Sequence, residues 1–218
     1  MAKTSLILDF GGVIAKTVFE QHRRTERLLG LTQGVLSWLG PLDPRTDEPR
    51  ARVERGEMTE RAYWVRRAAE VGRLVGQTWD VDTFFRGVQG DDANAVIRPQ
   101  AVTAVRRLRA SGVRLAVLSN ELERFFGPDV RSRIDLLSDI DVIVDGSGTG
   151  VRKPDPRAYE LCLKELGASA AEAIFVDDQR GNVEGARRLG IDAMQFDVRH
   201  PARCFAEIER LFRLGSPA

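Results

Sequence analysis

SLILDFGG, at residues 5–12, is the stretch of the sequence that decides the fold. It begins with a short apolar run, which is typical of a strand buried on both faces in a parallel sheet. The run ends in an acid, Asp9, and the glycine pair Gly11-Gly12 that follows predicts a turn. Ligands of parallel α/β sheets bind beyond the carboxyl ends of the strands, so Asp9 is a candidate functional residue.

The sequence from Pro99 onward repeats this pattern of strand and helix. Strands that alternate with amphipathic helices predict a mostly parallel, doubly wound sheet, so the expected fold class is α/β with a Rossmann-like core. The glycine-rich GSGTG at 146–150 lacks the spacing of a nucleotide-binding loop, and we predict a plain loop there. Further strands are expected at 113–120, 141–146, 173–178 and 192–196, and helices at 99–112, 121 to about 137, 154–167, 182–190 and 200–212.

The segment between the first strand and Pro99 has a different pattern. It shows helical periodicity interrupted by prolines, and it contains no convincing strand. Thr59 is a candidate N-cap of one helix. We therefore predict a Rossmann-like core of residues 1–15 and 91–218, with an α-helical cap of residues 16–90 inserted over the ligand-binding edge. The apolar stripe expected on the helix after Thr59 consists of Trp64, Ala68, Val71 and Val75.

The composition argues against several classes of function. Of the 218 residues 43% are hydrophobic, which is enough for a sizeable core. Lys and Arg number 33 and Asp and Glu 32, so the net charge is +1 and no long-range attraction to nucleic acid or to an anionic membrane is expected. The apolar run near the N-terminus is too short for a signal sequence or a membrane span, and no other stretch approaches a transmembrane length.

Cysteine usage indicates a reducing compartment. Cys162 and Cys204 lie far apart within helical apolar patterns, which predicts buried reduced thiols rather than a disulfide. We therefore expect a cytoplasmic protein. The sequence leaves open whether it is a monomer or a homodimer. His22 and His200 are expected to have surface or structural roles. The tryptophans expected mainly in the core of the cap are Trp38, Trp64 and Trp79.

Polar residues that end three of the expected strands predict the chemistry of the site. Asp9, Ser119-Asn120 and Asp177-Asp178 should meet at one edge of the sheet. Converging carboxylates repel one another, and a bound cation relieves that repulsion; hard oxygen ligands suit Mg²⁺. An aspartate beside such a metal can attack phosphorus, while Ser119 and Lys153 can donate to the phosphate oxygens.

Four motifs in order along the chain resemble those of the haloacid dehalogenase superfamily, in its capped form. One such motif alone would be a weak signal, whereas four at expected strand ends and loops are specific. The resemblance covers the whole expected core. The motifs are Leu8-Asp9-Phe10-Gly11-Gly12-Val13, Leu118-Ser119-Asn120, Lys153-Pro154-Asp155 and Val176-Asp177-Asp178, the last followed by Asn182 and Gly185-Ala186.

The resemblance implies a role for each matching residue. Asp9 is the nucleophile of a phosphohydrolase that acts on small phosphorylated metabolites through an aspartyl-phosphate. Mg²⁺ is held by Asp9, by the carbonyl of Gly11 and by Asp178, with Asp177 bound directly or through water. Ser119 and Asn120 orient the phosphoryl group, and Lys153 neutralises it.

One position departs from the pattern of the family. Most phosphatases of the superfamily carry a second aspartate two residues after the nucleophile, which protonates the leaving group and later activates water. Here that position is Gly11. Glu20, Glu121 or a cap residue could substitute for the missing acid, or the enzyme could be slow and favour good leaving groups.

The substrate and the reaction therefore stay open at this stage. Residues 55–60 (RGEMTE) with Tyr63-Trp64 resemble a branch with an Asp-x-Gly first motif, which is similar to sugar-phosphate phosphatases of the glucose-1-phosphate type. A dehalogenase that needs no metal is an alternative, although the intact Asp177-Asp178 pair argues against it. A weakened binding or regulatory protein on the same scaffold is the other alternative.

Overall fold

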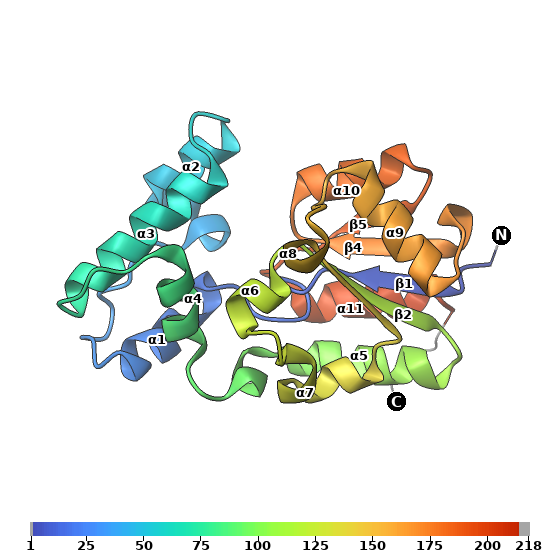
Figure 1. The fold of residues 1–218 in the computed structure, drawn as a ribbon, viewed down its shortest axis with the longest axis horizontal. Helices are drawn as coiled ribbons and strands as arrows, with labels where there is room; N and C mark the ends of the chain where they lie inside the picture. The colour runs from blue at the N-terminus through green and yellow to red at the C-terminus, as the bar shows by residue number, and fades with distance from the viewer. Residues whose placement is uncertain (1, 214–218) are drawn as a thin grey trace. The chain divides into compact units, whose positions relative to one another are not determined.

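The computed structural model of the protein describes residues 2–213, which contain a five-stranded sheet (Figure 1). All strand pairs are parallel and the strand order is β3-β2-β1-β4-β5. β1 and β4 are buried along their whole length, which explains why they read as continuous apolar runs. The predicted α/β fold is confirmed. The strands are β1 (Ser5–Leu8), β2 (Arg114–Ser119), β3 (Val142–Asp145), β4 (Ala173–Asp177) and β5 (Asp192–Gln195).

Helices cover both faces of this sheet. α5 (Pro99–Ala110) and α11 (Pro201–Leu211) lie on one face, and α9 (Pro156–Leu166) and α10 (Arg180–Arg188) lie on the other (Figure 1). Each of the four was expected from its amphipathic pattern. In α5 the buried residues recur at helical spacing, which places one apolar stripe against the sheet: Ala101, Ala104, Val105 and Leu108.

Two sequence-based expectations for this part of the chain were inaccurate. The helical stretch after β2 is divided into α6 (Leu122–Phe126), α7 (Val130–Arg133) and a 3-10 turn at Asp135–Asp139, because Gly127 ends α6 with a positive φ of 89°. The predicted GSGTG loop is wrong: Gly146–Thr149 forms one helical turn, α8. The carboxylate of Asp145 caps this turn by accepting from the backbone N–H of Ser147.

The chain divides into two compact units. One, here called the core unit, runs up to Lys16 and resumes at Ile97; the other, here called the insertion unit, is Thr17–Val96. The described residues of the insertion unit form no strand, as expected. Its helices are α1 (His22–Leu28), α2 (Glu48–Glu54), α3 (Glu60–Leu74) and α4 (Val81–Gln89), with 3-10 turns at Phe19–Gln21, Gly40–Leu42, Pro44–Thr46 and Ala93–Val96.

The insertion unit has its own apolar core. Thr59 caps α3 by accepting from the N–H of Ala62 at 3.2 Å, which confirms the predicted start of this helix. Ala68 and Val71 of the predicted stripe are fully buried, whereas Trp64 and Val75 are only partly buried. The largest buried side chains of this core are Phe19, Trp38, Tyr63 and Phe84.

A buried polar network, which the sequence did not reveal, runs through this core. Asp47 is fully buried and accepts from the hydroxyl of Tyr63 at 2.7 Å and from the guanidinium of Arg67 at 2.5 Å. Because both partners satisfy the carboxylate, its burial is compatible with a stable core. The network therefore has a structural role.

The remaining expectations concern the membrane and the thiols. Among residues 2–213, no helix combines the length and the apolar character that crossing a membrane requires. Cys162 and Cys204 are both buried and free, as predicted. Burial raises the pKa of the Cys162 thiol to about 12, so this group stays protonated and unreactive at neutral pH.

Candidate active site

The register of the sheet brings the predicted strand ends level with one another. Leu8 at the end of β1 lies beside Val117 of β2 and Val176 of β4. Asp9 therefore lies level with Leu118 and Asp177. Ser119 of β2 and Asp178, which follows β4, lie one position further along. The site is built entirely from the core unit.

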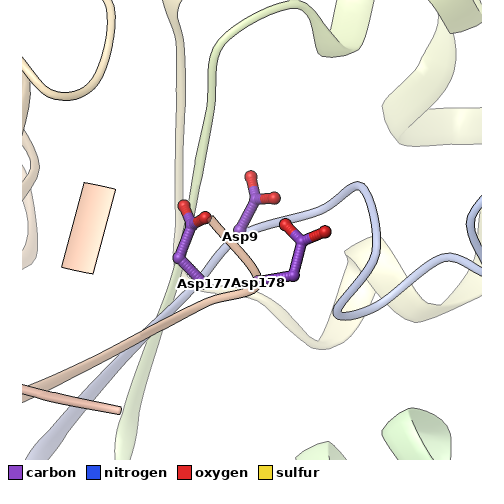
Figure 2. Close-up of side chains that lie close together, drawn as sticks. All are labelled: Asp9, Asp177 and Asp178. Atoms are coloured by element: carbon purple, nitrogen blue, oxygen red, sulfur yellow. The ribbon is translucent and has the colours of Figure 1, made fainter. Parts of the chain in front are cut away.

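Three carboxylates converge at this edge. Asp9, Asp177 and Asp178 each offer an oxygen, and the three oxygens lie within 4.8 Å of one another. Figure 2 shows the three side chains projecting to the same side of the strand ends. Carboxylate oxygens at this separation can share one hard divalent cation.

Lys153 supplies the positive charge of the site. Its Nζ atom lies 2.6 Å from Oδ1 of Asp9 and 2.7 Å from Oδ2 of Asp177, and the side chain is 1% exposed. Asn120 holds the lysine backbone on both sides: its Oδ1 accepts from the N–H of Lys153 at 2.7 Å, and its Nδ2 donates to the Lys153 carbonyl at 3.1 Å. The amide of Asn120 is thus committed to placing Lys153.

Asp177 is occupied by donors from the protein itself. Besides Lys153, its carboxylate accepts from the N–H of Gln179 at 2.8 Å and from Nδ2 of Asn182 at 3.0 and 3.1 Å. It is completely buried, whereas Asp178 is partly exposed. Asp177 is therefore better placed to hold Lys153 than to bind a cation directly.

The charges of the site leave room for a divalent cation. Burial raises the pKa of Asp9 to about 7; the charge of Lys153 opposes this rise and the charge of Asp177 adds to it. Burial acts to lower the pKa of Lys153, but Asp9 and Asp177 outweigh it and raise that pKa, so the lysine stays charged. A bound Mg²⁺ would favour the ionised form of Asp9, because its charge would offset the carboxylates that Lys153 alone does not balance.

Gly12 fits closely against one of the carboxylates. It has a φ of +81°, and a Cβ at this position would lie 2.6 Å from Oδ2 of Asp178. Only glycine therefore allows the loop after β1 to approach Asp178. This close approach, with the three oxygen ligands beside it, fits a small cation such as Mg²⁺.

Gly11 faces open space instead. A Cβ built on Gly11 meets no atom of the core unit within 4 Å, and its φ is not positive. Two carboxyls, Glu20 and Glu121, were expected as possible substitutes for the missing acid, and both have partners of their own. Glu20 accepts from the N–H and the hydroxyl of Thr17, and Glu121 pairs with Arg124 at 2.8 Å and Arg152 at 3.4 Å.

Ser119 is available for a ligand. It ends β2 and is 7% exposed. Within residues 2–213 its hydroxyl has no hydrogen-bond partner, so the group can donate to a bound oxyanion.

Two buried charged residues near the strand ends were missed by sequence reasoning. Asp145 ends β3 and accepts from the N–H groups of Leu122 at 3.0 Å and Glu123 at 2.8 Å, and from the Ser147 hydroxyl. It is an acid at a strand end that caps helices instead of joining the carboxylate cluster. Arg98 is 2% exposed and donates to the carbonyl of Gly12. Its position just before a helix carried no signal of burial.

Comparison with known proteins establishes the family. The family described as haloacid dehalogenase-like hydrolase matches residues 4–190. This chain belongs to that family of hydrolases.

Relatives of this chain include phosphatases. It is 33% identical to Phosphatase MT3486 of Mycobacterium tuberculosis over 90% of this chain and 88% of that protein. It is 32% identical to Acyl-CoA dehydrogenase family member 10 of Mus musculus, over 78% of this chain but only 15% of the mouse protein. A phosphoglycolate phosphatase of Pseudomonas syringae is 30% identical over 51% of this chain and 40% of its own length.

Solved structures agree with the fold. The HAD-hydrolase YfnB of Bacillus subtilis, determined bound to magnesium, superposes with a TM-score of 0.70 at 14% identity, over 98% of this chain and all of the other. L-2-haloacid dehalogenase of Xanthobacter autotrophicus superposes with a TM-score of 0.57 at 18% identity, over 88% of this chain and 77% of the other. At these identities the likeness concerns the fold.

Proposed function

We propose that the protein is a Mg²⁺-dependent phosphohydrolase that transfers the phosphoryl group of a small metabolite to Asp9 and then to water. The observation that carries this proposal is the position of Lys153, whose ammonium group bridges Asp9 and Asp177 beside Asp178. In this proposal a nucleophile, a cationic clamp and metal ligands share one edge of the sheet, as phosphoryl transfer requires.

The chain's own residues account for most of the first half-reaction. An oxygen of Asp9 attacks phosphorus, and the bond from phosphorus to the ester oxygen breaks as the alcohol oxygen leaves with the electron pair. Lys153 and the Ser119 hydroxyl stabilise the phosphoryl oxygens. Asn120 acts on the substrate through the placement of Lys153, which its amide holds from both sides.

In the second half-reaction water attacks the phosphorus of the aspartyl-phosphate. Inorganic phosphate leaves and the carboxylate of Asp9 is restored. Mg²⁺, when bound, would neutralise charge on the phosphoryl oxygens. Asp9, Asp178 and the Gly11 carbonyl would hold it, with Asp177 in an outer position.

Gly11 bears on which substrates react well. With no carboxyl at this position, the leaving oxygen departs without help from a neighbouring acid, so esters of acidic alcohols are favoured. The anomeric hydroxyl of a sugar is a better leaving group than an ordinary alcohol. We therefore propose sugar 1-phosphates as the substrate class, consistent with the Asp-x-Gly first motif, and the insertion unit as the cap that selects among them.

A haloacid-type dehalogenase is the second candidate, favoured by the absence of an acid at Gly11. The convergence of three carboxylates on the single lysine Lys153 argues against it, because a reaction without metal leaves this cluster with no cation to share. The mycobacterial relative, which covers most of this chain, also bears the name of a phosphatase.

A screen for phosphate release tests the proposal. Sugar phosphates, nucleotides, glycolytic acids and an aryl phosphate would be incubated with the protein, with Mg²⁺ or with a chelator. We expect release that requires Mg²⁺ and is fastest for aryl and anomeric phosphates. Halide release from a 2-haloacid in the presence of chelator would support the dehalogenase instead, and phosphate binding without turnover on any ester would indicate a non-catalytic protein.

A further inference from the structure

The loop that carries two of the proposed metal ligands is intrinsically flexible. Gly11 and Gly12 are consecutive, and glycine loses more backbone freedom on ordering than any other residue. The loop therefore depends on hydrogen bonds that fix its backbone. On its N-terminal side, the N–H of Ala15 donates to the carbonyl of Phe10 at 2.8 Å.

Arg98 holds the other side of the loop. Its Nη2 atom donates to the carbonyl of Gly12 at 3.0 Å, across 86 positions of sequence. The backbone N–H of Arg98 donates to the carbonyl of Ile14 at 2.9 Å, and Ile97 forms a β-bridge with Ala15. The segment in which the chain returns from the insertion unit thus lies along the glycine loop.

The same guanidinium also packs against the second ligand-bearing segment. Its central carbon lies 5.6 Å from the ring centroid of Phe196. The N–H of Phe196 donates to the carbonyl of Asp177 at 2.9 Å, and the neighbouring Gln195 donates through Nε2 to the carbonyl of Asp178 at 3.2 Å. One buried side chain therefore contacts the loop of Gly12 and the segment that supports both aspartates.

We infer that Arg98 is a positioning residue of the metal site. Arg98 fixes the Gly12 carbonyl relative to the segment of Gln195 and Phe196, which supports Asp177 and Asp178. It thereby keeps the Gly11 carbonyl and the carboxylates of Asp9 and Asp178 at the positions that one cation needs. Arginine suits this task because its planar fork makes a directed hydrogen bond while its face packs on an aromatic ring. The inference rests on the proposed Mg²⁺ site.

Direct titration of Mn²⁺, followed by electron paramagnetic resonance, tests this role without relying on turnover. Replacing groups that orient metal ligands commonly weakens metal binding by about 10- to 100-fold. We expect Arg98→Met to weaken Mn²⁺ binding by about tenfold and Arg98→Lys by about threefold, since lysine keeps the charge and one donor but loses the fork. Arg107→Met is the matched control. It removes an α5 arginine that pairs with Glu209 at 2.8 Å, and should leave binding unchanged.

The outcomes separate this inference from the proposed function. Wild-type protein that binds Mn²⁺ at a site removed by Asp178→Asn supports the metal site, and absence of such binding overturns the proposed function. Unchanged affinity in both Arg98 variants, with wild-type binding intact, overturns the inference alone. If Arg98→Met does not fold, Arg98→Lys decides, because unchanged affinity in this folded variant contradicts a positioning role.

Discussion

The Nζ atom of Lys153 lies 2.6 Å from Oδ1 of Asp9, although 144 positions of sequence separate the two residues. Both side chains are buried, and the lysine also contacts Asp177. The ammonium group therefore holds two carboxylates that would otherwise repel each other, and it is close enough to Asp9 to neutralise the phosphoryl group that we propose Asp9 accepts.

Replacing this lysine should affect catalysis and stability together. Lys153→Met removes the charge that stabilises the phosphoryl oxygens, so kcat/KM should fall by about 10²- to 10³-fold. It also leaves buried carboxylates unpaired, which should lower the free energy of unfolding by about 3 kcal/mol. Steady-state kinetics and denaturant unfolding measure the two effects. Lys164→Met, on the exposed side of α9, serves as the control, and equal behaviour of the two variants would contradict the account.

The open space at Gly11 predicts a gain of function. Gly11→Asp meets no steric obstacle within the core unit and restores a carboxyl two residues after the nucleophile. We expect kcat for alkyl phosphates to rise by about 10²-fold, because proton transfer to the leaving oxygen becomes possible, with a smaller gain for aryl phosphates.

Two neighbouring variants control for this gain. Gly11→Asn has nearly the same shape but cannot transfer the proton, so it should show no gain. Gly12→Ala places a Cβ on the carboxylate of Asp178 at a positive φ, and should lose activity. A gain in Gly11→Asn equal to that in Gly11→Asp would show that the carboxyl is not the cause.

The buried histidine of the insertion unit predicts a pH-dependent stability. His22 is 4% exposed and packs 4.3 Å from the ring of Trp38. Burial lowers its pKa to about 4, which the charge of Glu26 only partly opposes. The folded state therefore binds fewer protons than the unfolded state between pH 6.5 and 4. The stabilisation is complete above pH 6.5, and about 3 kcal/mol should be lost as the pH falls toward 4.

Tryptophan fluorescence measures this effect selectively, since all three tryptophans lie in the insertion unit. Denaturant unfolding at pH 7 and pH 4.5 should show a smaller pH difference in His22→Leu than in the wild type. His200→Asn changes the only other histidine, which is exposed, and should keep the wild-type difference. The same pH difference in wild type and His22→Leu would assign the effect to other groups.

The sequence predicted those features of the structure that local patterns determine. Strands β1 to β4 were recognisable from their apolar runs, and three of them were expected to end in polar residues that meet at one edge. Because the carboxyl ends of parallel strands share that edge, the proximity of Asp9 to Asp177 and Asp178 also followed from pattern alone. Lys153 could be placed there only through the resemblance to a family.

Other features could not be predicted because they depend on contacts between distant parts of the chain. The amide of Asn120 looks like a substrate ligand in the sequence, yet it bonds to the backbone of Lys153, 33 positions away. Arg98 precedes a helix and would ordinarily be exposed, but the carbonyl of Gly12 provides it with a buried acceptor. The expected GSGTG loop is instead a helical turn, which the carboxylate of Asp145 caps.

The central claim, that Asp9 accepts the phosphoryl group, is tested most directly by trapping the intermediate. Gly11 provides no base to activate water, so the aspartyl-phosphate should accumulate when the leaving group is good. Borohydride added during turnover of an aryl phosphate with Mg²⁺ should reduce it, and peptide mass spectrometry should find homoserine at position 9, with none formed in Asp9→Asn. Continued release of aryl alcohol in Asp9→Asn, or modification at another residue, would contradict the account.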